Sequence, residues 1–154
     1  MLNEYSVYWI KKEFALHYYH KSGILYRFLR DYQDNYMRQD LSEQFHYVTN
    51  TFPKSALIKH IEKSLLHRAT VNIHTRNEIE ISTEGQFLSL YVNEKVLKLY
   101  CESLHDAEEL LFPALRRFQS SLFIKGNNIE NYGWIAPVQK NPLSKDRQIL
   151  YSYN

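Results

Sequence analysis

The stretch EYSVYWIK, residues 4–11, is rich in the aromatic and β-branched side chains that favour a β-strand. Successive side chains of a strand point to opposite faces of the sheet. Tyr5 and Val7 therefore share one face, and Tyr8 and Ile10 share the other. Because both faces are apolar, the pattern predicts a strand in the interior of a sheet.

Apolar residues at helical spacing follow this strand. They predict a helical region over about residues 12–38, in which Gly23 breaks or bends the chain into a short helix and a longer one. The longer helix is amphipathic, because its apolar side chains recur every three or four residues: Leu25, Phe28, Leu29, Tyr32 and Tyr36. Two further helices are predicted, a short one over 42–48 and another over about 54–66 that begins after Pro53.

Beyond Arg68 the apolar period changes from helical spacing to strict alternation, which indicates strands. Residues 87–92 and 96–101 predict a β-hairpin. Ser103, followed by Asp106, resembles a capping box that opens a helix to about residue 118, with a kink at Pro113. A short buried strand over 122–124 follows.

This order of elements predicts an α+β fold in a single domain. We expect a central, mostly antiparallel β-sheet with an N-terminal strand, a helical segment after it, β-hairpins and a C-terminal helix and strand. The predicted domain covers residues 1–138. Residues 139–154 are predicted to form a polar, poorly anchored C-terminal tail that can be disordered.

Composition narrows the functional classes. Lys and Arg number 19 against 17 Asp and Glu, and the isoelectric point of about 8.5 does not favour direct binding of nucleic acid. The chain lacks an apolar run long enough to span a membrane, and its N-terminus does not resemble a secretory signal. A single cysteine cannot form an internal disulfide, so we expect a reducing, cytoplasmic location.

Motifs for catalysis or metal binding are not evident, and we predict neither catalytic residues nor a metal or cofactor. His17 and His20 lie three residues apart, but no carboxylate or cysteine joins them in a known metal-binding pattern. Cys101 precedes His105 by four residues and could act as a nucleophile, but it falls on the apolar face of a predicted strand. The pattern therefore favours a buried, structural thiol.

Aromatic residues mark a candidate protein-binding surface on the first predicted helix. Phe14 and Tyr18 are four residues apart and share one face, whereas Ala15 and Tyr19 form a neighbouring apolar stripe. If Ala15 and Tyr19 point toward the sheet, Phe14 and Tyr18 are at least partly exposed. Exposed aromatic pairs are typical of protein-binding patches, although packing of all four side chains in the core explains the same pattern.

At these residues the sequence resembles the family of sporulation inhibitors of replication, SirA, from endospore-forming bacteria. The resemblance covers about residues 4–138 and is loose over 68–86. It is carried by Tyr5, Tyr8, Ile10-Lys11, Glu13-Phe14-Ala15, His17-Tyr18, Phe28, Asp31-Tyr32, Gln44, Tyr47-Val48-Thr49, Tyr132-Gly133-Trp134 and Pro137-Val138.

The resemblance implies a regulator rather than an enzyme. Family members bind the N-terminal domain of the replication initiator DnaA and block its productive assembly at the chromosome origin during sporulation. They need neither a membrane nor direct contact with nucleic acid, and the resemblance implies no cofactor or small-molecule ligand. The implied contact residues lie on the first helix and on the nearby short helix, with His17 as part of a polar rim: Phe14, Tyr18, His17, Gln44, Tyr47 and Val48.

Two other functions remain open at this point. The first is a small α+β enzyme of acyltransferase-like type, whose catalytic groups are scattered along the sequence. The second is a regulator that binds nucleic acid through the basic residues of the helix over 54–66, although such a row is also typical of a solvated helix face. These residues are Lys54, Lys59 and Lys63, with Arg68 just beyond the helix.

Overall fold

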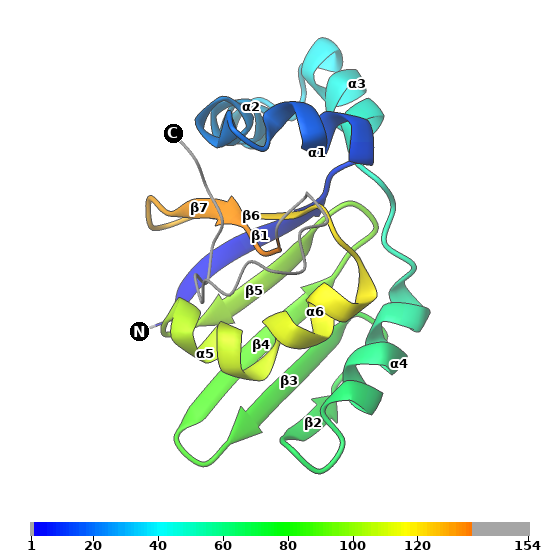
Figure 1. The fold of residues 1–154 in the computed structure, drawn as a ribbon, viewed down its shortest axis with the longest axis vertical. Helices are drawn as coiled ribbons and strands as arrows, with labels where there is room; N and C mark the ends of the chain where they lie inside the picture. The colour runs from blue at the N-terminus through cyan, green and yellow to red at the C-terminus, as the bar shows by residue number, and fades with distance from the viewer. Residues whose placement is uncertain (1, 137–154) are drawn as a thin grey trace.

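The computed structural model describes residues 2–136, which form one seven-stranded antiparallel sheet and six helices (Figure 1). The order of strands in the sheet is β2-β3-β4-β5-β1-β6-β7. The strands are β1 (Asn3–Trp9), β2 (Thr70–Ile73), β3 (Glu78–Thr83), β4 (Gln86–Val92), β5 (Leu97–Cys101), β6 (Leu122–Gly126) and β7 (Tyr132–Trp134). The helices are α1 (Lys12–Tyr18), α2 (Ser22–Asp34), α3 (Gln39–Val48), α4 (Lys54–Ser64), α5 (Leu104–Leu110) and α6 (Phe112–Phe118). The predicted α+β class and antiparallel sheet are confirmed.

Strand β1 is an interior strand, as its sequence predicts. It pairs with β5 on one side, where Val7 lies opposite Leu97, and with β6 on the other, where Val7 lies opposite Ile124. Tyr5 and Tyr8 are both buried, although they point to opposite faces of the sheet. The first strand of the chain therefore separates two hydrophobic cores.

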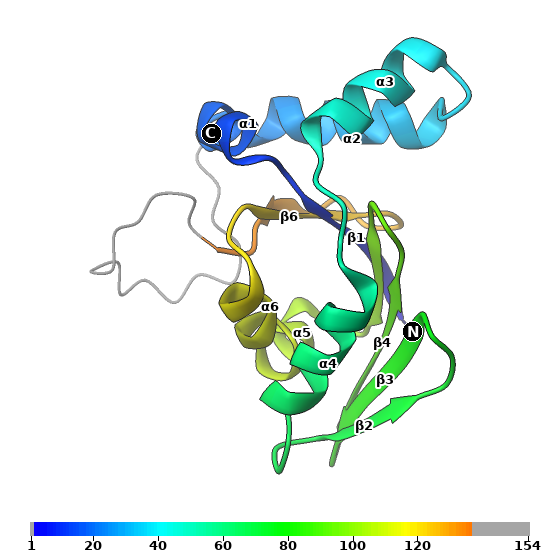
Figure 2. The same cartoon turned by 90° about the vertical axis from the view of Figure 1, so that its right-hand side faces the viewer.

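Two helical layers cover different parts of the sheet (Figures 1 and 2). Helices α4, α5 and α6 cover one face and enclose the larger core, which includes Leu88, Leu99 and Phe112. Helices α1, α2 and α3 lie over the opposite face, next to β1, β6 and β7. Their smaller core includes Phe45 and Trp134. The chain thus builds one helical layer before β2 and completes the other after β5.

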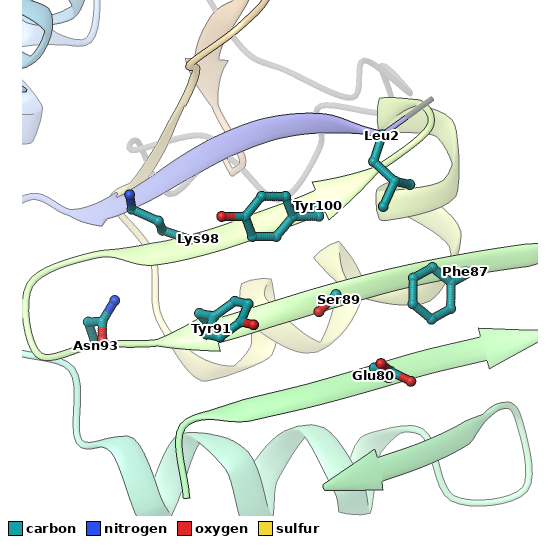
Figure 3. Close-up of a pocket in the computed structure, with 8 residues that line it drawn as sticks. All are labelled: Leu2, Glu80, Phe87, Ser89, Tyr91, Asn93, Lys98 and Tyr100. Atoms are coloured by element: carbon teal, nitrogen blue, oxygen red, sulfur yellow. The ribbon is translucent and has the colours of Figure 1, made fainter. Parts of the chain in front are cut away.

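The α1–α3 layer leaves part of its sheet face open. Figure 3 shows side chains of β3, β4 and β5 on this open part, among them Phe87, Tyr91 and Tyr100. Phe87 and Tyr91 are exposed, whereas Leu88 and Leu90, which point to the other face, are fully buried. The alternation along β4 follows directly from the two-residue period of a strand.

The first helical region differs in detail from its prediction. The break falls at residues 19–21, and Gly23 lies inside the first turn of α2 rather than at the break. Helix α2 ends at Asp34, because the backbone of Asn35 leaves the helical conformation at φ −134° and ψ 43°. The Asn35 amide and side chain both donate to the Asp31 carbonyl and so cap this end. Tyr36 therefore lies outside the helix and is 65% exposed, contrary to its predicted place in the apolar stripe.

The predicted helix over 103–118 is two helices rather than one kinked helix. The break lies at Leu111, two residues before Pro113, since proline lacks an amide proton and is accepted in the first turn of α6. The sequence also missed β7, where Gly133 pairs with Ile124 of β6. The predicted tail, residues 139–154, lies outside the described residues.

Candidate functional site

Backbone hydrogen bonds hold the start of α1 beside the end of α3. The Lys11 amide donates to the Val48 carbonyl at 2.8 Å, and the Asn50 amide donates to the Trp9 carbonyl at 2.7 Å. An isolated antiparallel bridge pairs Ile10 with Thr49 between these two bonds. Residues that are far apart in the sequence therefore meet at one surface, where α1 leaves β1 and the chain leaves α3.

Phe14 and Tyr47 join the two helices through their side chains. Their ring centroids are 5.4 Å apart and the rings meet edge to face, which is a favourable aromatic geometry. The Lys11 Nζ lies over the Tyr47 ring, 4.9 Å from its centroid. Phe14 is half-buried, whereas Tyr47 is 66% exposed. An aromatic surface thus continues across α1 and α3.

Of the two interpretations that the sequence left open for α1, the structure shows the one in which Ala15 and Tyr19 point inward. Ala15 and Tyr19 are buried beneath the helix, and Phe14 and Tyr18 are half-buried beside them. The exposed His17 ring packs against Tyr18, with 4.9 Å between ring centroids. The inward pair anchors the helix, so the outward aromatic side chains keep part of their surface in water.

Helix α3 places the other sequence-predicted residues on one face. Gln44 precedes Tyr47 by three residues and Val48 by four, a spacing that brings side chains together on a helix. Gln44 is exposed and Val48 is half-buried. The structure joins Phe14 to Tyr47 directly and Val48 to α1 through the backbone. Within residues 2–136, Gln44 forms no side-chain hydrogen bond to Tyr18 or His17.

Sequence reasoning missed one residue that lies beside this surface. Lys11 contributes its ammonium group to the Tyr47 ring, a contact between segments that the sequence does not show to be neighbours. We define the α1–α3 face as Phe14, His17, Tyr18, Gln44, Tyr47 and Val48.

The other candidate groups do not converge on a site. Cys101 is fully buried, and burial, with a smaller contribution from the Asp106 charge, raises the pKa of its thiol to about 12. That shift opposes formation of a nucleophilic thiolate. His105 Nε2 lies 2.7 Å from Glu109 Oε1 rather than against Cys101. Within residues 2–136, no three His, Cys, Asp or Glu side chains cluster as metal ligands.

The basic residues of α4 lie on a mixed-charge surface. Lys59 and Lys63 are exposed on the helix, and the exposed Glu62 lies between them in the sequence. Arg68 lies beyond the end of α4 at Ser64. This mixture of charges is typical of a solvated helix face, which was one of the two interpretations of these residues in the sequence. None of the helices within the described part of the chain has the length and apolarity needed to cross a membrane.

Comparison with known proteins supports the resemblance seen in the sequence. A family model described as the sporulation inhibitor of replication protein SirA matches residues 3–139. The sporulation inhibitor of replication protein SirA of Bacillus subtilis (strain 168) is 22% identical over 144 residues, which cover 91% of this chain and 97% of that protein. The match spans both helical layers and every strand of the sheet. The chain therefore belongs to the SirA family of sporulation inhibitors of replication.

Proposed function

We propose that this protein inhibits the initiation of chromosome replication during sporulation by binding the N-terminal domain of DnaA through its α1–α3 face. The protein acts in the cytoplasm, as a binding partner and not as an enzyme. Membership of the SirA family supports the role in replication. The identity of the partner follows from the resemblance at the residues of the α1–α3 face.

The contact between Phe14 and Tyr47 is the observation that carries this proposal. It joins two aromatic side chains from different helices into one surface that retains substantial exposure. Both residues are among those that the family resemblance implies as contacts. Aromatic side chains bury large areas with few torsions to immobilise, so they are suited to binding a shallow groove on another protein.

The mode of inhibition follows from the kind of surface. A protein that occupies a surface needed for self-assembly of DnaA inhibits stoichiometrically, and no chemical step is required. The aromatic side chains supply the affinity at the centre of the interface, whereas the exposed His17 and Gln44 form polar contacts at its rim. Rim contacts of this kind set orientation and association rate more than affinity.

The test is a calorimetric titration of the full chain with the isolated N-terminal domain of the host's DnaA. The wild type should bind saturably at a 1:1 ratio. Tyr47→Ala and Phe14→Ala should each weaken binding by about 2–4 kcal/mol, the range of interface hot spots. Tyr47 is 66% exposed, so its replacement should leave the unfolding midpoint close to that of the wild type.

Tyr36→Ala is the matched control, because Tyr36 is 65% exposed but lies outside the α1–α3 face. It should bind DnaA as the wild type does. An unchanged affinity of a folded Tyr47→Ala variant would refute the proposed face. Failure of the folded wild type to bind at concentrations up to about 100 μM would refute DnaA as the partner.

A further inference from the structure

A pocket of about 320 Å³ lies on the inner side of α3, between the α1–α3 layer and the sheet. Its base is formed by Ser6 and Tyr8 of β1, both of which are buried. Tyr32 of α2 and Phe45 of α3 line it as aromatic walls. Lys95, in the turn between β4 and β5, and Lys98 of β5 line it as well. The volume is at the lower end of the range for small-molecule sites.

The walls of this pocket are flat and held in place by one another. Tyr32 and Phe45 stack with ring centroids 4.0 Å apart and only 7° between their planes. Tyr8 meets the same Phe45 ring edge to face at 5.8 Å. The two rings cover each other's facing sides, so a ligand meets the remaining surface of the half-buried Tyr32 and the exposed Tyr36, both of which line the pocket. Ring surface held in place by packing accepts an apolar body with little reorganisation.

Charge on the pocket is of one sign. Lys95 and Lys98 contribute the charged side chains of its lining, and none of the lining residues is an aspartate or glutamate. The Lys95 ammonium donates to the Thr49 carbonyl at 3.0 Å, which leaves its positive charge without a carboxylate there. Burial and the charge of Lys11 lower the pKa of Lys95, and the charge of the neighbouring Glu94 opposes this shift in part. An anion in the pocket would relieve this cost.

Strand β6 places a third lysine, Lys125, next to the base of the pocket. Strand register places Lys98 opposite Ser6, and Ser6 opposite Lys125 on the next strand. These three side chains therefore form one row across the face of the sheet that α2 and α3 cover. Two ammonium groups therefore flank the buried Ser6 hydroxyl, although the charges of Asp34 and Glu4 partly offset that of Lys125.

Two other hollows on the described surface carry charges of both signs. The open sheet face combines Lys98 with Glu80, and Figure 3 shows the Lys98 amine directed away from Glu80. The hollow between α2 and the β6–β7 turn combines Arg30 and Lys125 with Asp34 and Glu130. Mixed charges do not select the sign of a ligand, whereas the lining of the α3 pocket does.

We propose that the α3 pocket binds a small organic anion with a planar, apolar body. The accessible aromatic surface of Tyr32 and Tyr36 contacts the planar body, and Lys95 and Lys98 neutralise the acidic group. Either a carboxylate or a phosphate ester carries the required chemistry. The site is distinct from the α1–α3 face, because Phe45 and His46 point into the pocket whereas Gln44 and Tyr47 do not line it.

The test is ligand-observed NMR on the full chain with three probes that share one ring system. The probes are 2-naphthoate, 2-naphthyl phosphate and the neutral 2-naphthamide. At least one anion should bind saturably, with a dissociation constant of about 1 mM or below and at least about tenfold tighter than the amide. Whichever anion binds more tightly identifies the acidic group of the ligand. Neither DnaA nor any cofactor takes part in this measurement.

Two variants locate the binding. Lys95→Gln combined with Lys98→Gln should weaken the anions about tenfold and leave the amide unchanged, because only the charge of the pocket is removed. Val96→Trp should fill the pocket and abolish binding of all three probes. Lys59→Gln combined with Lys63→Gln is the control, since it removes the same charge from the exposed face of α4. Circular dichroism establishes that each variant is folded.

Three results would overturn the proposal. Equal affinity for 2-naphthoate, 2-naphthyl phosphate and 2-naphthamide would show that the charge of the pocket selects nothing. Unchanged anion binding by the folded Lys95 and Lys98 double variant would place the anions elsewhere. Absence of saturable binding for both anions would show that the pocket is not a site for this class of ligand. If Val96→Trp fails to fold, the double variant still decides the outcome.

Discussion

Lys125 of β6 is a buried lysine whose ammonium group has defined hydrogen-bond partners. It lies on an interior strand, only 2% of its surface is exposed, and its ammonium donates to the side chains of Gln33 and Asn127. Burial lowers its pKa from 10.5 to about 8. A buried cation that is solvated by amide oxygens still costs folding free energy, because those oxygens replace water only in part.

The pH dependence of stability should reveal this cost. Between pH 8 and 10.5 the unfolded chain keeps the Lys125 proton and the folded chain releases it, so this residue makes stability rise with pH across that window. The free energy of unfolding of the wild type, minus that of Lys125→Met, should therefore increase by up to about 3 kcal/mol from pH 7.5 to 10.5. Urea melts at a series of pH values measure this difference, in which the titrating tyrosines cancel.

The exposed Lys63 provides the control for this measurement. The difference between the wild type and Lys63→Met should stay flat over the same range of pH. A flat difference for Lys125→Met as well would show that the folded protein does not disfavour the charged form of Lys125.

At the scale of elements, the short helices depend on their contacts. α1, α5 and α6 contain seven residues each, fewer than an isolated helix needs to be stable in water. α1 is held by Ala15 and Tyr19 beneath it and by the backbone bond from Lys11 to α3. α5 is also stabilised by an N-cap, because the Ser103 hydroxyl accepts a hydrogen bond from the Asp106 amide. The N-cap bond of the capping box predicted from the sequence is therefore confirmed.

Removal of this cap should have a measurable cost. Ser103→Ala leaves an amide at the start of α5 without its side-chain acceptor, and we expect a loss of about 1 kcal/mol in the free energy of unfolding. Chemical denaturation of the variant and the wild type measures it. Ser55→Ala replaces an exposed serine within α4 and should change the free energy by less than about 0.5 kcal/mol. A Ser103→Ala variant as stable as the wild type would show that the cap contributes nothing.

At the scale of the whole molecule, one sheet joins two cores. β1 contributes Val7 to the larger core and Tyr8 to the smaller one, so neither core is complete without the same strand. The two tryptophans fall on opposite sides of the sheet, because Trp9 packs against the larger core and Trp134 lies in the smaller one. Each core therefore contacts one tryptophan, whose fluorescence can report on the packing of that core.

These reporters should show one cooperative transition. In Trp9→Phe the fluorescence reports on the α1–α3 layer, and in Trp134→Phe it reports on the layer of α4–α6. Within each variant, the urea transitions followed by fluorescence and by circular dichroism should coincide, as two-state unfolding requires. A fluorescence transition that precedes the loss of circular dichroism in either variant would show that its layer unfolds independently.

Much of the fold follows from local pattern. The apolar residues on both faces of EYSVYWIK placed β1 in the interior of the sheet, and alternation placed the hairpin of β4 and β5. The helix ends were less accurate, because α2 stops where Asn35 satisfies the last carbonyls and α6 begins at a backbone turn before Pro113. Strand β7 was missed since three residues are too short for a period to be recognised.

The sequence by itself determined the α+β class and the buried thiol of Cys101, because each depends on the spacing of apolar residues along one segment. Only the tertiary structure decided that Tyr47 meets Phe14 and Lys11, and that Lys95 and Lys98 line a pocket beside Phe45. Such contacts join segments far apart in the chain. Their geometry is set by the pairing of strands and the packing of helices, and neither leaves a periodic signal in the sequence.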